Sequence, residues 1–330
     1  MKKLLYTLAL LAICFSCVEV IDLSTRDGEK TLVVDGMFTT KLKQHQVKLS
    51  YTTVYPSNPN ALPEEQLISG AQVQVISEAG ETFDFYESAI GVYSTIDSVA
   101  GIVGGTYQLR LFVDDQEYLS DPQTITPVTA PDSIYYEYLE DEDNIAVYID
   151  SKDPGDSRNF YRWTWTSNYI VITNFGDELD CCARCFISKV SNDIVLHEDT
   201  YTNGQPIIKK EIAKIPVDIN GDYLIFINQH SISIETYDYY DLLNRQISST
   251  GNLFDPPPSR LIGNISAVNS NENVLGFFMA SDEKTIFGQI KRSPYFTGLG
   301  KVSRYGDCRL LTNSDTLTPP FWNTKVLPIY

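Results

Sequence analysis

The sequence predicts a mainly β protein made of two β-sandwich domains in series, Ig-like and then fibronectin type III-like, with one helix and a long loop inserted in the second. Short stretches of alternating apolar and polar residues follow one another at intervals of about 8–12 residues, the pattern of half-buried strands. The composition agrees, because 21 Tyr and 15 Phe far outnumber 3 Met, and aromatic residues favour strands. A length of 330 residues suits about two domains of roughly 150 residues.

The first sandwich is expected over residues 31–126. Apolar residues alternate or form short runs in its predicted strands, at residues 31–38, 46–54, 71–76, 91–96, 106–113 and 117–119. Asp114, Asp115 and Gln116 form the predicted turn between the last two strands. Residues 55–63 contain three prolines, and we expect a loop there because proline cannot join a central strand.

The second sandwich is expected over residues 131–330, after a boundary marked by Pro122, Pro127 and Pro131. Its predicted strands cover residues 133–138, 145–149, 160–166, 169–172 and 223–227, and residues 187–195 also suggest strands. Apolar residues then recur every three or four positions, which predicts a helix over about residues 233–250 that stops at Gly251. After the loop at residues 252–258, we expect residues 274–280 and 285–290 to form a hairpin that closes the sheet.

The first sixteen residues read as a secretory leader. Lys2 and Lys3 precede an apolar run at residues 4–15, whose roughly 12 residues would reach only about 18 Å as a helix, too short for a hydrocarbon core of about 30 Å. Ser16 before Cys17 resembles the cleavage site of a bacterial lipoprotein, in which the cysteine is lipidated. A plain signal peptide cleaved elsewhere is the alternative.

Lipidation of Cys17 would anchor the mature chain to a membrane without a spanning segment. Residues 17–30 would form an acidic tether, and two or more acyl chains would hold the protein durably. Loss of Lys2 and Lys3 with the leader changes the net charge from −18 to −20. A body of this charge is repelled by anionic lipid surfaces.

Four further cysteines are candidates for disulfides: Cys181, Cys182, Cys185 and Cys308. Outside the cytoplasm thiols tend to pair, and four cysteines allow three connectivities. We favour one bond within the cluster and one from the cluster to Cys308. A zinc site or free thiols are the alternatives. A redox Cys-x-x-Cys is disfavoured, because strands rather than a helix are expected to follow.

Composition and motifs exclude several function classes. The acidic balance argues against nucleic acid, whose phosphates need clustered Lys and Arg. His45, His197 and His230 lie singly in strand-like sequence, and no nucleophile elbow, phosphate-binding loop, dinucleotide fingerprint or zinc-protease motif occurs. We therefore expect no catalytic residues and no cofactor. A hydrolase built on two distant carboxylates stays open, because such pairs leave no local motif.

Two acidic stretches contain the oxygen ligands that calcium prefers. These are residues 140–143 and the series Asp150, Asp153 and Asp156. Neither follows the alternating pattern of a calcium-binding loop, and both fall at predicted turns. We therefore expect solvated turns at both, with calcium as the alternative.

Aromatic residues provide the remaining candidates for contact with a ligand or partner. Tyr161, Trp163 and Trp165 share one face of a strand, which we expect to be the core; an open stacking platform is the alternative. On the helix, the periodicity places Tyr237 and Tyr240 in the packing and displays Tyr239. Loops on rigid scaffolds often carry function, so Tyr239, Phe254 and Asp255 are the candidate partner contacts.

Together these segments resemble the Bacteroidetes lipoprotein family known as domain of unknown function 4249. The resemblance rests on Cys17 with Glu19, residues 32–36, 91–93, 105–109, 118–120, 131–134 and 161–163, the clustered cysteines, residues 231–240, and Gly251-Asn252 before the prolines. It implies a lipoprotein facing the surface or the periplasm, encoded beside TonB-dependent outer-membrane transporters. It transfers no catalytic residue.

The sequence thus leads to a non-enzymatic outer-membrane lipoprotein that serves as an accessory or ligand-capture component of a TonB-dependent nutrient uptake system. Its expected partners are the membrane, through the lipid, a TonB-dependent transporter and an unknown nutrient. A surface hydrolase with an unrecognised carboxylate site and an Ig-like adhesion or structural protein are the alternatives.

Overall fold

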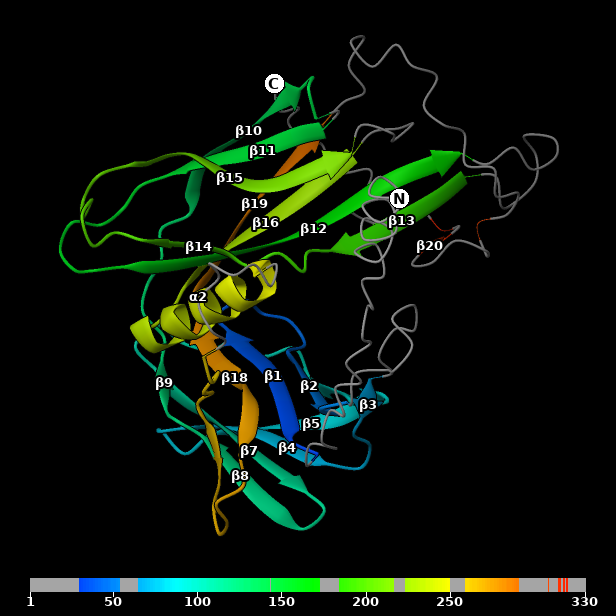
Figure 1. The fold of residues 1–330 in the computed structure, drawn as a ribbon, viewed down its shortest axis with the longest axis vertical. Helices are drawn as coiled ribbons and strands as arrows, with labels where there is room; N and C mark the ends of the chain where they lie inside the picture. Colours follow the sequence, from blue (N-terminus) through cyan, green and yellow to red (C-terminus); the bar gives the residue numbers. More distant parts are fainter. Residues whose placement is uncertain are drawn as a thin grey trace, which may run out of the picture. The chain divides into compact units, whose positions relative to one another are not determined.

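A computed structural model describes residues 30–53, 65–142, 144–172, 184–216, 223–249 and 259–290, together with residues 308, 314, 315, 317 and 319 (Figure 1). Residues 31–52 and 65–330 belong to one compact unit. The described residues of that unit form three β-sheets and one helix. The predicted mainly β class, with sheets packed as sandwiches, is confirmed.

The strands of the first sandwich form one continuous hydrogen-bonded path, in which β5 joins two halves. Its strands are β1 (Leu32–Thr39), β2 (Gln46–Tyr51), β3 (Gln66–Leu67), β4 (Gln72–Ser77), β5 (Thr82–Ala89), β6 (Val92–Thr95), β7 (Thr106–Val113), β8 (Gln116–Ser120), β9 (Gln123–Thr124), β17 (Ile265–Ala267) and β18 (Val274–Ser281). Strand β5 pairs with β4 on one side and with β6 on the other. Buried residues from both halves therefore meet in one core.

Strand β7 shows how the local pattern produces this core. Its side chains alternate between half-buried and buried along the whole strand, and Leu109 and Leu111 are fully enclosed. The following turn has positive φ at Asp114 (48°) and Asp115 (65°), as a two-residue type I′ turn requires. The predicted β7–β8 hairpin is thereby confirmed.

The second sandwich packs a three-stranded sheet against a six-stranded sheet. The smaller sheet contains β10 (Pro131–Leu139), β11 (Asn144–Ser151) and β15 (Ile207–Pro216); the larger contains β12 (Phe160–Ile172), β13 (Arg184–Val190), β14 (Val195–Glu198), β16 (Tyr223–Ser231), β19 (Glu283–Ile290) and β20 (Ser314–Asp315). The two predicted strands at residues 160–172 are one continuous strand, β12.

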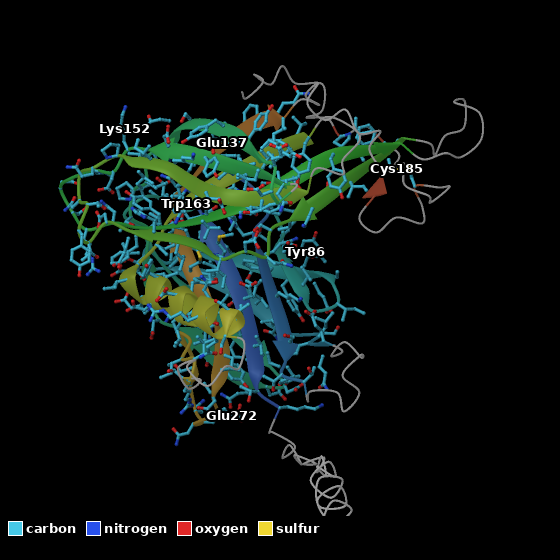
Figure 2. All side chains as sticks on the ribbon, turned by 45° about the horizontal axis from the view of Figure 1, so that its top comes forward. Tyr86, Glu137, Lys152, Trp163, Cys185 and Glu272 are labelled. Carbon is cyan, nitrogen blue, oxygen red and sulfur yellow. A yellow bond between two sulfur atoms is a disulfide. The ribbon has the colours of Figure 1, made fainter. Side chains whose placement is uncertain are left out.

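The aromatic face of β12 lies in the core of the second sandwich. Tyr161, Trp163 and Trp165 are at most 2% exposed and pack with apolar residues of β11, β15 and β16. Figure 2 shows Trp163 among the strands of this sandwich. The core interpretation is confirmed, and a stacking platform at this face is excluded.

The predicted hairpin of residues 274–280 and 285–290 is wrong. Strand β18 pairs in parallel with β1, from Leu32 opposite Val274 to Thr39 opposite Ser281. Strand β19 pairs with β16 instead. No turn reverses the chain at residues 281–283, so it passes from the first sandwich to the second.

The chain therefore returns to the first sandwich after the helix, inside the range expected for the second domain. Strand β17 pairs with β8, and β18 follows beside β1. The helix itself is found as predicted: α2 spans Ile234–Ser248, and the Ser233 side chain caps it by accepting a hydrogen bond from the Thr236 amide.

Candidate functional site

Buried polar and charged side chains gather where the chain passes from β18 to β19. Ser281 and Asp282 are at most 1% exposed, and Glu283 is 6% exposed. They meet the end of β1, the linker before β10 and the end of β16. We call residues 281–283 and their partners the crossover cluster.

Glu283 is a buried acid of the crossover cluster that forms ion pairs with two lysines. Its carboxylate accepts a hydrogen bond from Thr39 Oγ1 at 2.8 Å and forms ion pairs with Lys43 Nζ at 2.5 Å and Lys41 Nζ at 3.5 Å. Burial opposes ionisation, yet the pKa of Glu283 is lowered to about 2. The charges of His230 and Lys43 and the hydrogen bonds from Lys43 and Thr39 outweigh burial, because they favour the charged form.

His230 carries its positive charge only in acid. It is fully buried, and burial lowers its pKa to about 3. Its Nε2 lies 3.1 Å from Thr164 Oγ1. His230 is therefore a neutral packing residue, as its position in a strand predicts.

Asp282 ties three segments together. One carboxylate oxygen accepts the Val128 amide at 2.9 Å, and the other accepts Thr40 Oγ1 at 2.5 Å and Lys284 Nζ at 2.9 Å. Burial would raise the pKa of Asp282, but these donors lower it overall. Because Val128 lies in the linker between the sandwiches, Asp282 fastens that linker to the crossover.

Helix α2 packs over the same junction. Tyr239 and Tyr240 contact Phe277 of β18, with ring centroids 4.9 and 6.4 Å away. The Arg162 guanidinium of β12 lies 4.0 Å from the Tyr240 ring centroid, a cation–π contact. The helix thus joins a strand of each sandwich through one apolar cluster.

The prediction that Tyr239 is displayed for a partner is wrong. Tyr239 is 9% exposed and Tyr240 is 7% exposed, while Tyr237 is half-buried and packs against Phe160 at 5.3 Å. Tyr239 and Tyr240 are both buried because the helix contacts more than one strand. Phe254 and Asp255 lie outside the described residues.

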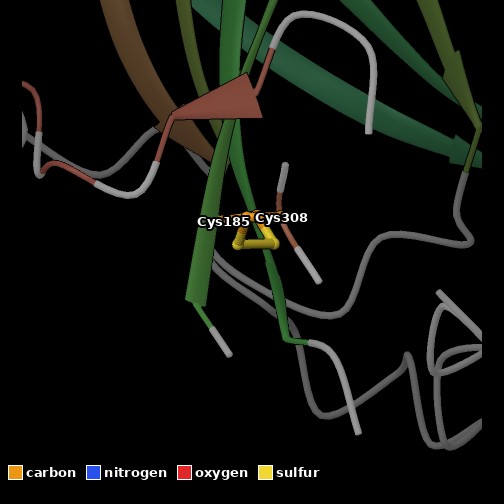
Figure 3. The surroundings of a disulfide bond; sticks show 2 residues. All are labelled: Cys185 and Cys308. Carbon is orange, nitrogen blue, oxygen red and sulfur yellow. A yellow bond between two sulfur atoms is a disulfide. The ribbon is translucent and has the colours of Figure 1, made fainter. Parts of the chain in front are cut away.

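One of the expected disulfides is present. Cys185 of β13 is bonded to Cys308, with Cα atoms 5.2 Å apart (Figure 3). Both cysteines are buried, at 0% and 1% exposed. The expected bond from the cluster to Cys308 is therefore seen, whereas Cys181, Cys182 and the lipidation candidate Cys17 lie outside the described residues.

The other two histidines are also engaged in packing. His45 is 1% exposed and its Nε2 lies 3.0 Å from the Val99 carbonyl oxygen; burial lowers its pKa to about 4. His197 stacks near Tyr161, with centroids 6.3 Å apart, and burial lowers its pKa. Both are neutral at pH 7.

The sequence-based calcium series is not brought together. Asp150 accepts hydrogen bonds from Ser133, Tyr135 and the Lys209 amide, Asp156 is exposed, and Asp153 is buried. In the first acidic stretch, residues 140–142 are exposed, and Asp143 lies outside the described residues. Over the described ranges, no three His, Cys, Asp or Glu side chains are grouped to hold a metal.

No sequence motif predicts the crossover cluster. Its one local signal is the adjacent pair Asp282 and Glu283, directly after the apolar run of β18. Two acids at a strand end ordinarily indicate a turn. Their burial follows from lysines and threonines about 240 residues earlier in the chain.

Comparisons with known proteins give a family and distant structural likenesses. A family model described as a domain of unknown function (DUF4249) matches residues 18–286. Among solved structures, a two fibronectin type III domain segment from chicken tenascin is 15% identical, with 78% of this chain and 99% of that chain covered and a TM-score of 0.17. No curated protein matches the chain. Within the described residues, α2 is too short and too polar to cross a bilayer.

Proposed function

The chain belongs to the DUF4249 family, a domain of unknown function, and from this premise we propose that it is an outer-membrane lipoprotein. In this proposal it is a non-enzymatic accessory or ligand-capture component of a TonB-dependent nutrient uptake system. The observation that carries the proposal is the leader, in which Lys2 and Lys3 precede an apolar run that ends at Ser16 and Cys17. Acylation of Cys17 would confine the protein to the envelope.

The distance from Cys17 to the folded body suits an anchored protein. Strand β1 begins at Leu32, and the intervening segment spans at most about 50 Å when fully extended. The lipid would therefore keep the sandwiches near the membrane and raise their effective concentration beside a transporter. The acidic body would stay solvated above anionic lipids.

The crossover cluster supports this use of two sandwiches. Strands β18 and β19 run from one sandwich into the other, and Asp282 and Glu283 fasten both to the end of β1. A binding surface on the second sandwich would thereby keep a fixed position relative to the first sandwich, which the tether connects to the lipid. A ligand or partner surface gains affinity when its position is fixed beforehand.

The first test addresses the anchor. We expect Cys17→Ala to move the protein from the membrane fraction to the soluble fraction, and we expect intact mass to show acyl chains on Cys17 of the unaltered protein. Cys14→Ala is the matched control, because Cys14 lies three residues earlier in the same leader and should leave anchoring unchanged. A mature chain with an unmodified amino terminus, released into the medium, would contradict the proposal.

The second test addresses the partner. After mild detergent extraction, an outer-membrane barrel should co-purify with the anchored protein, and growth on the transported nutrient should depend on the gene. Hydrolysis of glycans or peptides that is lost on acid-to-amide substitution would indicate a surface enzyme instead. Recovery of the protein alone, with normal nutrient uptake in its absence, would indicate an adhesion or structural role.

A further inference from the structure

Two loops at one end of the second sandwich bring two buried carboxylates together. Asp153 lies in the β11–β12 connection and is 8% exposed, and Asp199 follows β14 and is 1% exposed. The side-chain nitrogen of Asn159, Nδ2, lies 3.5 Å from an oxygen of each carboxylate. The loops touch closely, because a Cβ on Gly155 would lie 3.1 Å from the Cα of Gly204.

The position of this nitrogen is surrounded by oxygen atoms. Besides the two carboxylates, the carbonyl oxygens of Pro154 and Ser157 lie 3.0 and 2.9 Å from Asn159 Nδ2. An amide NH2 group has only two hydrogens to donate. Four oxygens therefore compete for two donors, and the site has more acceptors than the amide can satisfy.

Asp199 is the carboxylate of this pair that lacks close hydrogen-bond donors. Among the residues that the structure describes, its buried Oδ1 has no hydrogen-bond partner, and its Oδ2 has only the 3.5 Å contact with Asn159. Asp153, in contrast, accepts Tyr161 Oη at 2.5 Å and the Gly204 amide at 2.8 Å. A buried carboxylate without such donors is costly, so Asp199 calls for a cation.

No neighbouring side chain of the described part supplies that cation. Arg158 pairs with Glu198 at 2.8 Å, and Lys210 Nζ donates to the Leu196 carbonyl at 2.7 Å. His197 is neutral, as shown above. Within the ranges the structure describes, neither Asp153 nor Asp199 takes part in an ion pair with Lys, Arg or His.

We propose that Asp153 and Asp199, with the Pro154 and Ser157 carbonyl oxygens, bind a calcium ion that joins the two loops. Calcium accepts six to eight oxygens from carboxylates, carbonyls and water in irregular geometry. The ion would take the position of Asn159 Nδ2, so the Asn159 side chain would turn away to admit it. Magnesium fits less well, because it demands a near-ideal octahedron and keeps most of its water.

The expected affinity is that of an extracellular calcium module, with a dissociation constant of about 0.1–1 mM. The ion would shift the balance toward the folded state, because only the folded chain brings the loops together. It would also order residues 152–159 and 199–206. This inference does not depend on the lipid anchor or on a transporter.

The test uses the full chain freed of metal with a chelator and titrated with calcium chloride alone. At about 10 mM Ca²⁺ we expect the melting temperature to rise by about 5 °C, and Mg²⁺ at the same concentration to have less effect. Asp199→Asn should abolish the response. Asp156→Asn is the matched control, because Asp156 is exposed in the same loop and should leave the response intact.

The opposite result is equally clear. If Asp199 is an unpaired carboxylate and no ion binds, calcium will leave the melting temperature unchanged, and Asp199→Asn will stabilise the chain without calcium. An equal response in Asp199→Asn would also overturn the proposal. If that variant fails to fold, hydrogen exchange of the unaltered protein decides: calcium should slow exchange at residues 153–159 and 199–204, and unchanged exchange there contradicts the site.

Discussion

Single buried polar residues align the layers of this protein. Gln229 of β16 is 0% exposed, and its side chain accepts Trp163 Nε1 at 2.9 Å while it donates to the Thr129 carbonyl at 2.9 Å and to Ser151 Oγ at 3.0 Å. One amide thus links a strand of each sheet and the linker. A shifted register would leave these groups unsatisfied in the core, which is costly.

Glu283 also links separate segments through its side chain. Because it carries a full charge, it makes the free energy of unfolding depend on pH. Its pKa is about 2 in the folded protein, against 4.5 ordinarily. The folded state thus favours the ionised form. The stabilisation of the fold by Glu283 is therefore complete above about pH 4.5 and is lost as the pH falls toward 2. This difference corresponds to about 3 kcal/mol.

We therefore predict that Glu283→Gln lowers the free energy of unfolding at pH 7 by about 3 kcal/mol. The variant should also lose less stability than the unaltered protein between pH 4.5 and 2. Urea denaturation at several pH values measures both effects. Glu65→Gln is the control, because Glu65 forms an exposed pair with Lys48 at 2.7 Å and should cost under about 1 kcal/mol. Equal losses in the two variants would refute the assigned role of Glu283.

At the scale of elements, local pattern predicted the strands but not all their partners. The alternation in residues 106–113 and the two aspartates after them specify β7 and its turn, since both signals are local. Strand β18 carries an equally clear apolar run, yet its partner β1 lies 242 residues earlier. A run that is apolar on both faces fits several neighbours, so its pairing depends on the whole fold.

The burial of Tyr239 could not be predicted from the sequence for a related reason. A three–four periodicity identifies one apolar stripe of a helix, and it placed Tyr237 and Tyr240 inward. Tyr239 is buried by Phe277 of β18, a strand that was assigned to the wrong sheet. A bond from the cysteine cluster to Cys308 was predicted, because four cysteines allow only three connectivities. The structure adds that Cys185 is the cysteine of the cluster that forms it.

Helix α2 provides the prediction at this scale. Tyr239→Ala should lower the free energy of unfolding by about 3–5 kcal/mol, because it opens a cavity against Phe277. Ile247→Ala, on the same helix but at a side chain that is 68% exposed, should change it by less than about 0.5 kcal/mol. Guanidinium denaturation followed by circular dichroism measures both. Near-neutral Tyr239→Ala would restore the view that this side chain is displayed.

For the whole molecule, the parallel pairing of β1 with β18 links the first sandwich to the strand that continues into the second. The pairing requires glycine at position 276, which has a φ of +95°. A Cβ there would overlap the carbonyl oxygen of Val34 on β1. Because β19 continues directly from β18 through the crossover cluster, damage at Gly276 should reach both sandwiches.

We predict that Gly276→Ala lowers the unfolding midpoint of the second sandwich although the substitution lies in the first. Trp163 and Trp165 report on the second sandwich, and Trp322→Phe in all variants removes the third tryptophan. Gly80→Ala is matched, because Gly80 also has positive φ, at +87°, but has no atom within 4 Å of its Cβ position; it should cost about 1 kcal/mol. If the sandwiches are coupled, the tryptophan fluorescence of Gly276→Ala should change in one transition. The midpoint of that transition should lie at a clearly lower denaturant concentration than the midpoint for Gly80→Ala. A tryptophan transition that stays at the unaltered midpoint would mean that the sandwiches unfold independently.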